Sequence, residues 1–175
     1  MGQIADVALD SKSRVWLFSR SKHPITCWEK NGEFIGSWGN LGLDNNEFRV
    51  PHGMYIDSDD SIWLADHQTH LVTKHNENGD ILLSLGTFGY ANITVTTNDT
   101  QGSPFNMPTG IAINSNKKIF ISDGYANRRM HRFSSKGELE ISWGSAGTKE
   151  GQFAILHKVG VDKNDLVYDC DRENN

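Results

Sequence analysis

The strongest constraint on the fold is a unit that recurs along the whole chain. In each copy a short apolar segment is followed by an acidic or amide residue, a turn, and a second apolar segment. Two of the aligned positions lie nine residues apart in the second, third and fourth copies (57 and 66, 114 and 123, 162 and 171). This constant spacing places the copies at approximately residues 4–39, 48–86, 105–144 and 153–175. Repeats of this length indicate a fold built from equivalent, stacked units.

Each complete copy predicts four short β-strands. In the third copy, alternating apolar residues favour strands at Gly110–Asn114, Lys118–Asp123, Arg129–Phe133 and Leu139–Trp143. A glycine turn separates the last two strands of each copy, as in Ser135-Lys-Gly137. The segment Thr87–Ser103 has no such pattern and is predicted to be a loop. Four-stranded antiparallel units at this period are typical of a β-propeller, so the fold class is all-β.

The fourth copy ends after its second predicted strand. We therefore expect a single domain over residues 1–175 that forms an incomplete, open arc of about 3.5 blades. Closed propellers have about four to eight blades, so the arc would be part of a larger ring. An open arc leaves apolar faces and strand edges bare, through which copies of the chain could associate with one another.

Composition excludes two classes of partner. A net charge of −5 argues against a nucleic-acid surface, which needs a basic patch. No apolar run reaches the roughly 18 residues that a membrane span requires. Met1–Asp6 shows neither the basic nor the apolar region of a secretory signal peptide, so no compartment is assigned. Cys27 and Cys170 match no disulfide framework or zinc motif and are predicted to be reduced, partly buried thiols.

Four motifs resemble the NHL-repeat propellers and, among them, the peptidyl-α-hydroxyglycine α-amidating lyase family with its bacterial relatives. They are Pro51–Asp57, Ser122–Arg129, the pair Trp143-Gly144 with Gly151–Phe153, and Asp171–Asn174. The resemblance covers essentially the whole chain. Its specific part is the occurrence of Asp-Gly-Tyr-x-Asn-x-Arg and Asp-Arg-Glu-Asn in consecutive copies. It implies a six-bladed propeller, of which this chain supplies about three and a half blades.

Histidine recurs at one repeat position. His52 and His157 hold it in the second and fourth copies, whereas Thr109 and Ala5 hold it in the third and first. Two blades of a six-bladed ring subtend roughly 120°, so these imidazoles would point at the axis from two corners of a triangle. A third histidine, which the family has in its sixth blade, would complete a catalytic zinc site with an open fourth position. The competing interpretation is that two of the seven histidines fall on a repeat position by chance.

The resemblance implies a peptide or small N-acyl substrate that ends in α-hydroxyglycine and is cleaved to the amide and glyoxylate. It also implies that Tyr125 is the base. A phenol is a weak base near neutral pH, but nearby cations favour its anion. The alternative role for Tyr125 is packing at the end of a blade.

Arginine recurs at a second repeat position. Arg20 and Arg172 each lie ten residues after an aligned aspartate (10 and 162), at a position that His67 and Gly124 hold in the other two copies. A planar guanidinium forms two parallel hydrogen bonds with a carboxylate. Arg20 and Arg172 are therefore the candidates for binding the substrate carboxylate, and the family has arginines at both places.

The resemblance further implies a structural calcium on the axis, held by the backbone carbonyls of Val7 and Met54 and by a later aspartate. In the fourth copy the family's usual Pro-His-Ser or Pro-His-Gly is replaced by Leu156-His-Lys158. A lysine ammonium beside a metal cation is unfavourable.

The remaining histidines lack such a placement. His70 falls where the family also has a histidine and is expected to be structural, and the others are predicted at the surface or in turns: His23, His67, His75 and His131. Asp169 occupies a strand position that is apolar in the other copies. Either its strand is an edge, or Arg172 or a further blade compensates its charge.

Three functions are consistent with these residues. The first is a zinc-dependent lyase acting on peptidyl-α-hydroxyglycine, present here without its third zinc histidine. The second is a non-catalytic NHL propeller that binds a peptide or a protein. The third is a calcium-dependent hydrolase of lactones or esters. We expect a full-length protein to bind zinc and to release glyoxylate from α-hydroxyhippurate, and the 175-residue chain alone to be poorly soluble and nearly inactive.

Overall fold

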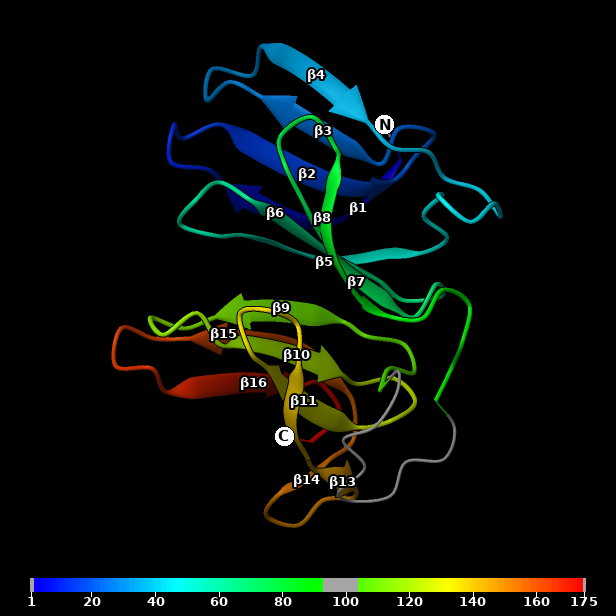
Figure 1. Ribbon diagram of the computed structural model, residues 1–175, viewed down its shortest axis with the longest axis vertical. Helices are drawn as coiled ribbons and strands as arrows, with labels where there is room; N and C mark the ends of the chain where they lie inside the picture. Colours follow the sequence, from blue (N-terminus) through cyan, green and yellow to red (C-terminus); the bar gives the residue numbers. More distant parts are fainter. Residues whose placement is uncertain (1, 93–103, 175) are drawn as a thin grey trace.

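The protein is all β in a computed structural model that describes residues 2–92 and 104–174 (Figure 1). Three antiparallel sheets have four strands each in sequence order, and one has two strands. The blades follow one another from the blue N-terminal sheet to the red C-terminal strands in Figure 1. This arrangement confirms the predicted propeller class. No segment within the two described ranges forms a helix that could cross a membrane. Most of the predicted loop Thr87–Ser103 lies outside the described residues.

The strands agree with the repeat pattern. The first blade contains β1 (Gln3–Leu9), β2 (Val15–Arg20), β3 (Ile25–Trp28) and β4 (Phe34–Trp38). The second contains β5 (Pro51–Ile56), β6 (Ile62–Asp66), β7 (Leu71–His75) and β8 (Ile81–Gly86). The third contains β9 (Gly110–Ile113), β10 (Ile119–Asp123), β11 (Arg129–Phe133) and β12 (Leu139–Trp143), each within one residue of its predicted bounds. After the short parallel pair β13 (Ser145–Ala146) and β14 (Gln152–Phe153), the last sheet contains β15 (Leu156–Val161) and β16 (Val167–Asp171).

The apolar core lies between consecutive blades. Phe18 of the first blade shares one buried cluster with Leu64 of the second, and Trp63 of the second shares another with Ile121 of the third. A third cluster joins the third blade to Leu156 of β15. Strands β6 and β10 are buried at every residue, as expected for strands covered on both faces. Each large apolar side chain in these clusters contributes about 1.5–3 kcal/mol by burial. Contact between blades therefore holds the arc together.

The innermost strands line the axis. Strand β1 contacts β5, β5 contacts β9, and β9 contacts β15. These strands line a cavity of about 370 Å³, which is bordered by residues 7–9, 54–56, 111–113 and 158–161. Residues of all four inner strands therefore lie close together at the axis although they are far apart in the sequence.

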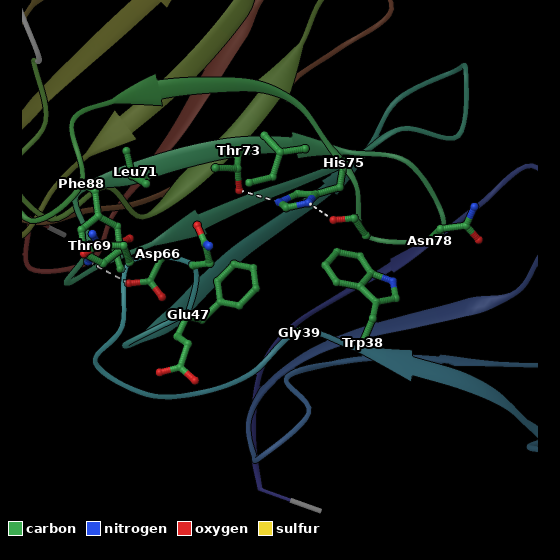
Figure 2. Close-up of a pocket in the computed structure, with 15 residues that line it drawn as sticks. Trp38, Gly39, Glu47, Asp66, Thr69, Leu71, Thr73, His75, Asn78 and Phe88 are labelled. Atoms are coloured by element: carbon green, nitrogen blue, oxygen red, sulfur yellow. Dashed lines mark hydrogen bonds between the residues drawn. The ribbon is translucent and has the colours of Figure 1, made fainter.

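Two histidines contradict the sequence prediction. His75 and His131, expected at the surface or in turns, are buried strand residues with exposures of 4% and 1%. Figure 2 shows the His75 ring beside a cavity of about 260 Å³ between the first two blades, hydrogen-bonded to Thr73. Each ring is accommodated because both of its nitrogens have partners, which the repeat pattern alone cannot reveal.

The cysteines also differ from one another. Both are free thiols, as predicted, but Cys27 is buried in the cluster between the first two blades and Cys170 is exposed on β16. Asp169 lies exposed on the same strand, at the edge of the two-stranded sheet. Its carboxylate therefore retains solvent, although partial burial and the nearby Asp171 raise its pKa.

Candidate functional site

A β-bulge carries each of the two repeat-position histidines. The register of β5 against β6 shifts between Pro51 and Gly53, so His52 is the extra residue. The register of β15 against β16 shifts between Leu156 and Lys158, which makes His157 the extra residue. A bulge bends its strand and redirects a side chain. The two imidazoles therefore do not follow the regular alternation of side chains between the two faces of their sheets.

The aligned aspartates fix the start of each inner strand. The carboxylate of Asp66 accepts hydrogen bonds from the backbone N–H groups of Arg49 and Val50, just before β5. Asp171 does the same for the backbone N–H groups of Ala154 and Ile155, just before β15. Charge-assisted bonds of this kind are strong. Asp66 and Asp171, the second residue of their nine-residue pairs, therefore have a structural role, since each anchors the segment that leads into a histidine.

The two histidines face a common phenol oxygen. The Nε2 atom of His52 lies 3.4 Å from the hydroxyl of Tyr125, and the Nε2 atom of His157 lies 3.1 Å from it. The centroids of the two imidazoles are 4.8 Å apart. Residues from the second, third and fourth blades thus converge on one point at the end of the axis.

A glycine permits Tyr125 to reach this point. Gly124 lies between the end of β10 and Tyr125, and a Cβ at its position would collide with the backbone of Leu156 on β15. The chain of the third blade can therefore lie directly against the strand that bears His157. The Asp-Gly-Tyr motif is explained by this close approach of two backbones.

The protonation of His52 is fixed by its surroundings. Its Nδ1 atom lies 2.8 Å from the backbone carbonyl oxygen of Thr109, which can only accept, so Nδ1 carries the proton and Nε2 carries the lone pair. Burial lowers the pKa of His52 to about 4, and the nearby His157, His67 and Arg20 act in the same direction. Burial, followed by the charges of Arg172 and Lys158, also lowers the pKa of His157. Both imidazoles are thus favoured in the neutral form, which is the form that binds metals.

The two candidate arginines are not placed alike. Arg172 donates from Nη1 to the Tyr125 hydroxyl at 3.4 Å, and its guanidinium lies 5.6 Å from the centre of the tyrosine ring. Arg20 donates to the backbone carbonyl of Pro51 and to the side chain of Gln3. Within the described residues no hydrogen bond joins Arg20 to Tyr125. It lies at the side of the cluster, near enough for its charge to lower the pKa of His52.

His67 is a site residue that sequence reasoning missed. Its ring centroid is 4.7 Å from that of Tyr125, and the ring is stacked on His52 with centroids 6.0 Å apart. Its Nδ1 atom is buried and has no hydrogen-bond partner in the described part of the chain. The signal was present, since His67 occupies the repeat position of Arg20 and Arg172. His70, by contrast, accepts a hydrogen bond from the backbone N–H of Met107, consistent with the structural role expected of it.

The cluster contains two candidate zinc ligands. Two neutral imidazoles with converging Nε2 atoms are suitable zinc ligands. Across residues 2–92 and 104–174, however, no group of three or more histidine, cysteine or acidic side chains is arranged to hold a metal. The residues present therefore fit two ligands of a tetrahedral site, and the remaining ligands would have to come from elsewhere.

The residues expected to bind calcium lie together but fit a calcium ion poorly. Val7 and Met54 both line the axial cavity. Lys158 lines the same cavity, and its ammonium group already forms an ion pair with Asp6. A lysine cation in this position opposes a second, divalent cation.

Comparison with known proteins supports the sequence resemblance. No protein-family model matches the chain. Peptidylglycine alpha-amidating monooxygenase from Rattus norvegicus is 31% identical over 202 residues, covering 99% of this chain and 20% of the relative. Peptidyl-alpha-hydroxyglycine alpha-amidating lyase 1 from Drosophila melanogaster is 37% identical over 82 residues, covering 42% of this chain and 15% of the relative. The chain therefore spans about a fifth or less of the curated relatives that it matches.

Solved structures support the fold. A catalytically inactive variant of virginiamycin B lyase from Staphylococcus aureus, crystallised with quinupristin, has a TM-score of 0.66 at 15% identity, covering 98% of this chain and 50% of that chain. A streptogramin B lyase has a TM-score of 0.65 at 15% identity, covering 94% of this chain and 47% of that chain. At this level of identity the likeness shows the fold alone.

Proposed function

We propose that this chain, a β-propeller segment related in sequence to the peptidyl-α-hydroxyglycine α-amidating lyases, carries part of a lyase active site. The reaction would convert a peptidyl-α-hydroxyglycine to the peptide amide and glyoxylate. The observation that carries the proposal is the convergence of His52, His157 and Arg172 on the hydroxyl group of Tyr125. A single phenol surrounded by two neutral imidazoles and one guanidinium is suited to moving a proton beside a bound anion.

Arg172 and Tyr125 have separate roles in this proposal. The guanidinium of Arg172 lies over the tyrosine ring and is exposed on its other side, so it can bind the carboxylate of the substrate. Arg20, at the side of the cluster near His52, would contribute a second cation for the same carboxylate.

These positions suggest how protons would be transferred in the reaction. Tyr125 would accept the proton of the substrate α-hydroxyl group, whose C–O bond becomes the carbonyl of glyoxylate as the C–N bond breaks. The amide nitrogen leaves with the electron pair and needs a proton, which the tyrosine can return. Zinc, when bound, would supply Lewis acidity that lowers the pKa of the substrate hydroxyl. His52 is already oriented for this ion, because Thr109 fixes its tautomer.

The test is release of glyoxylate from α-hydroxyhippurate by the longest polypeptide that carries this chain, supplied with zinc. We expect Tyr125→Phe to retain zinc but to lose activity by about 100-fold or more, as for removal of a general base. His157→Ala should lose both zinc and activity. His23→Ala is the matched control, since His23 is an exposed histidine that bonds to the carbonyl of Gly39. The absence of glyoxylate from folded, zinc-loaded protein would contradict the proposal and favour a non-catalytic peptide-binding propeller.

A further inference from the structure

An ion pair connects the first and fourth blades across the axis. The ammonium group of Lys158 on β15 contacts the carboxylate of Asp6 on β1. The same carboxylate oxygen accepts a hydrogen bond from the backbone N–H of Met54 on β5, at 2.7 Å. The Asp6 side chain is only 14% exposed. One largely buried carboxylate therefore connects three blades.

The two charged residues occupy equivalent repeat positions. Asp6 and Lys158 each follow the bulge of their strand directly, where the second and third blades have Gly53 and Gly110. A Cβ on Gly53 would collide with the carbonyl oxygen of Thr109, and one on Gly110 would lie 3.0 Å from the hydroxyl of Ser122. Glycine is thus required at position 53, where the third blade approaches closely, and a side chain at position 110 would have little room. The two end blades instead carry side chains, and these have opposite charges.

This position adjoins the residues from which axial calcium binding was expected. Val7 follows Asp6 and donates its backbone N–H to that carboxylate at 3.0 Å, and Met54 also donates to it. Calcium requires six to eight oxygen ligands, usually with carboxylates among them. None of the residues lining the cavity is acidic. The neighbouring Asp6 carboxylate is already neutralised by Lys158.

We propose that the ammonium group of Lys158 takes the place of a calcium ion at the axis, so that an internal ion pair with Asp6 joins the inner strands and no divalent cation binds there. The inference rests on the axial cavity and is independent of the proposed lyase activity. A cation that is part of the chain requires no ligand from solution. The joint between the blades would then be indifferent to the calcium concentration.

The first test compares thermal unfolding of the chain in EGTA with that in millimolar calcium, with magnesium as the ionic-strength control. We expect the same Tm in all three conditions. Asp6→Asn and Lys158→Met should each lower the Tm by about 2–4 °C. The double variant should lower it by no more than the more severe single change, because both remove one interaction. Lys136→Met, which removes an exposed lysine in a hairpin turn, should leave the Tm within about 1 °C.

Two results of the unfolding measurements would overturn the proposal. One is a Tm of the unaltered chain that rises saturably with calcium but not with magnesium. The other is additive losses in the double variant, which would mean that Asp6 and Lys158 act separately. Isothermal titration calorimetry of the unaltered chain with calcium tests directly whether calcium binds. This measurement needs no variant, so the proposal stays testable even if Asp6→Asn does not fold. Heat from calcium binding to a single site would refute it.

Discussion

Two groups of histidines differ in where their ring nitrogens find partners. His131 bonds through Nδ1 to Ser142 at 2.7 Å and through Nε2 to Asp123 at 3.2 Å, all within the third blade. His75 likewise bonds to the carbonyl of Gly79 and to the hydroxyl of Thr73, both in the second blade. These rings are fully satisfied by their own sheet and serve the packing of that sheet.

The histidines at the end of the axis bond differently. His52 uses Nδ1 to reach Thr109 of the next blade, which leaves Nε2 directed at Tyr125. His157 also directs Nε2 at Tyr125. One nitrogen of His52 is thus hydrogen-bonded to the scaffold, while the other is directed at the Tyr125 hydroxyl among the described residues. The comparison teaches that burial alone does not mark a functional histidine, whereas an uncommitted nitrogen shared between blades does.

The largest effect is expected at the carboxylate that supports His131. Asp123 is fully buried and accepts hydrogen bonds from the backbone of Asn106 and the side chains of Asn127 and His131. Asp123→Ala removes the buried carboxylate that these donors share and should lower the free energy of unfolding by about 3–5 kcal/mol, measured by urea denaturation. Asp169→Ala, at an exposed aspartate, should change it by less than about 0.5 kcal/mol. Equal losses of unfolding free energy in the two variants would contradict a structural role for the buried carboxylate.

The next effect concerns acid stability of metal-free protein in EDTA. Burial lowers the folded pKa of His52 from 6.5 to about 4, so between these values the unfolded chain binds a proton that the folded chain does not. The stabilising contribution is complete above pH 6.5, is lost as the pH falls toward about 4, and amounts to ~3 kcal/mol. Urea unfolding at several pH values measures it. His52→Gln should make the unfolding free energy less dependent on pH in this window. An unchanged pH dependence would contradict the assignment of the effect to His52.

Substitution of the two kinds of histidine should separate stability from metal binding. His131→Gln disturbs two buried partners and should cost about 2 kcal/mol of unfolding free energy, with zinc affinity unchanged. His52→Gln should cost about 1 kcal/mol, and zinc affinity should fall at least about tenfold because a ligand nitrogen is lost. Urea denaturation and equilibrium dialysis measure the two quantities. A fall in zinc affinity in both variants would show that the distinction between the histidines is wrong.

The smallest effect on stability is expected at Tyr125. Its hydroxyl makes hydrogen bonds no shorter than 3.1 Å, and its ring is only half-buried. Tyr125→Phe keeps the ring contacts with His67 and should change the free energy of unfolding by less than about 0.5 kcal/mol. Urea denaturation in EDTA provides the measurement. A loss above 2 kcal/mol would make Tyr125 a structural residue, against the comparison.

Much of the fold could be predicted because the repeat specifies it. The alternation of apolar residues predicted the strands of the third blade to within one residue. The nine-residue spacing that located the copies ends at anchoring aspartates such as Asp66 and Asp171. The equivalent positions of His52 and His157 likewise predicted that these rings could meet, and they lie in contact. Repeat position carries this information because equivalent residues point in equivalent directions around an axis.

Contacts between different repeat positions were not predictable in the same way. The partners of His131 lie on strands β10 and β12, at positions that look like ordinary polar residues in the sequence. The hydrogen bond from Arg20 to the backbone carbonyl of Pro51 joins two blades, and the repeat position of Arg20 alone does not predict it. Lys158 appeared in the sequence only as an unfavourable neighbour of a metal. Its pairing with Asp6 requires the curvature of the arc, which no local pattern encodes.

The repeated bulge has a consequence for how such a ring can change chemistry without changing architecture. The register of three inner strands shifts at one extra residue, which is Ala5, His52 or His157. The hydrogen-bonded pairing of the neighbouring residues therefore does not depend on which side chain stands at that position. A symmetric scaffold can therefore present an asymmetric set of side chains at its mouth. New reactivity in this kind of propeller is open to single substitutions at these three places, whereas the strands beside them remain under the constraint of pairing.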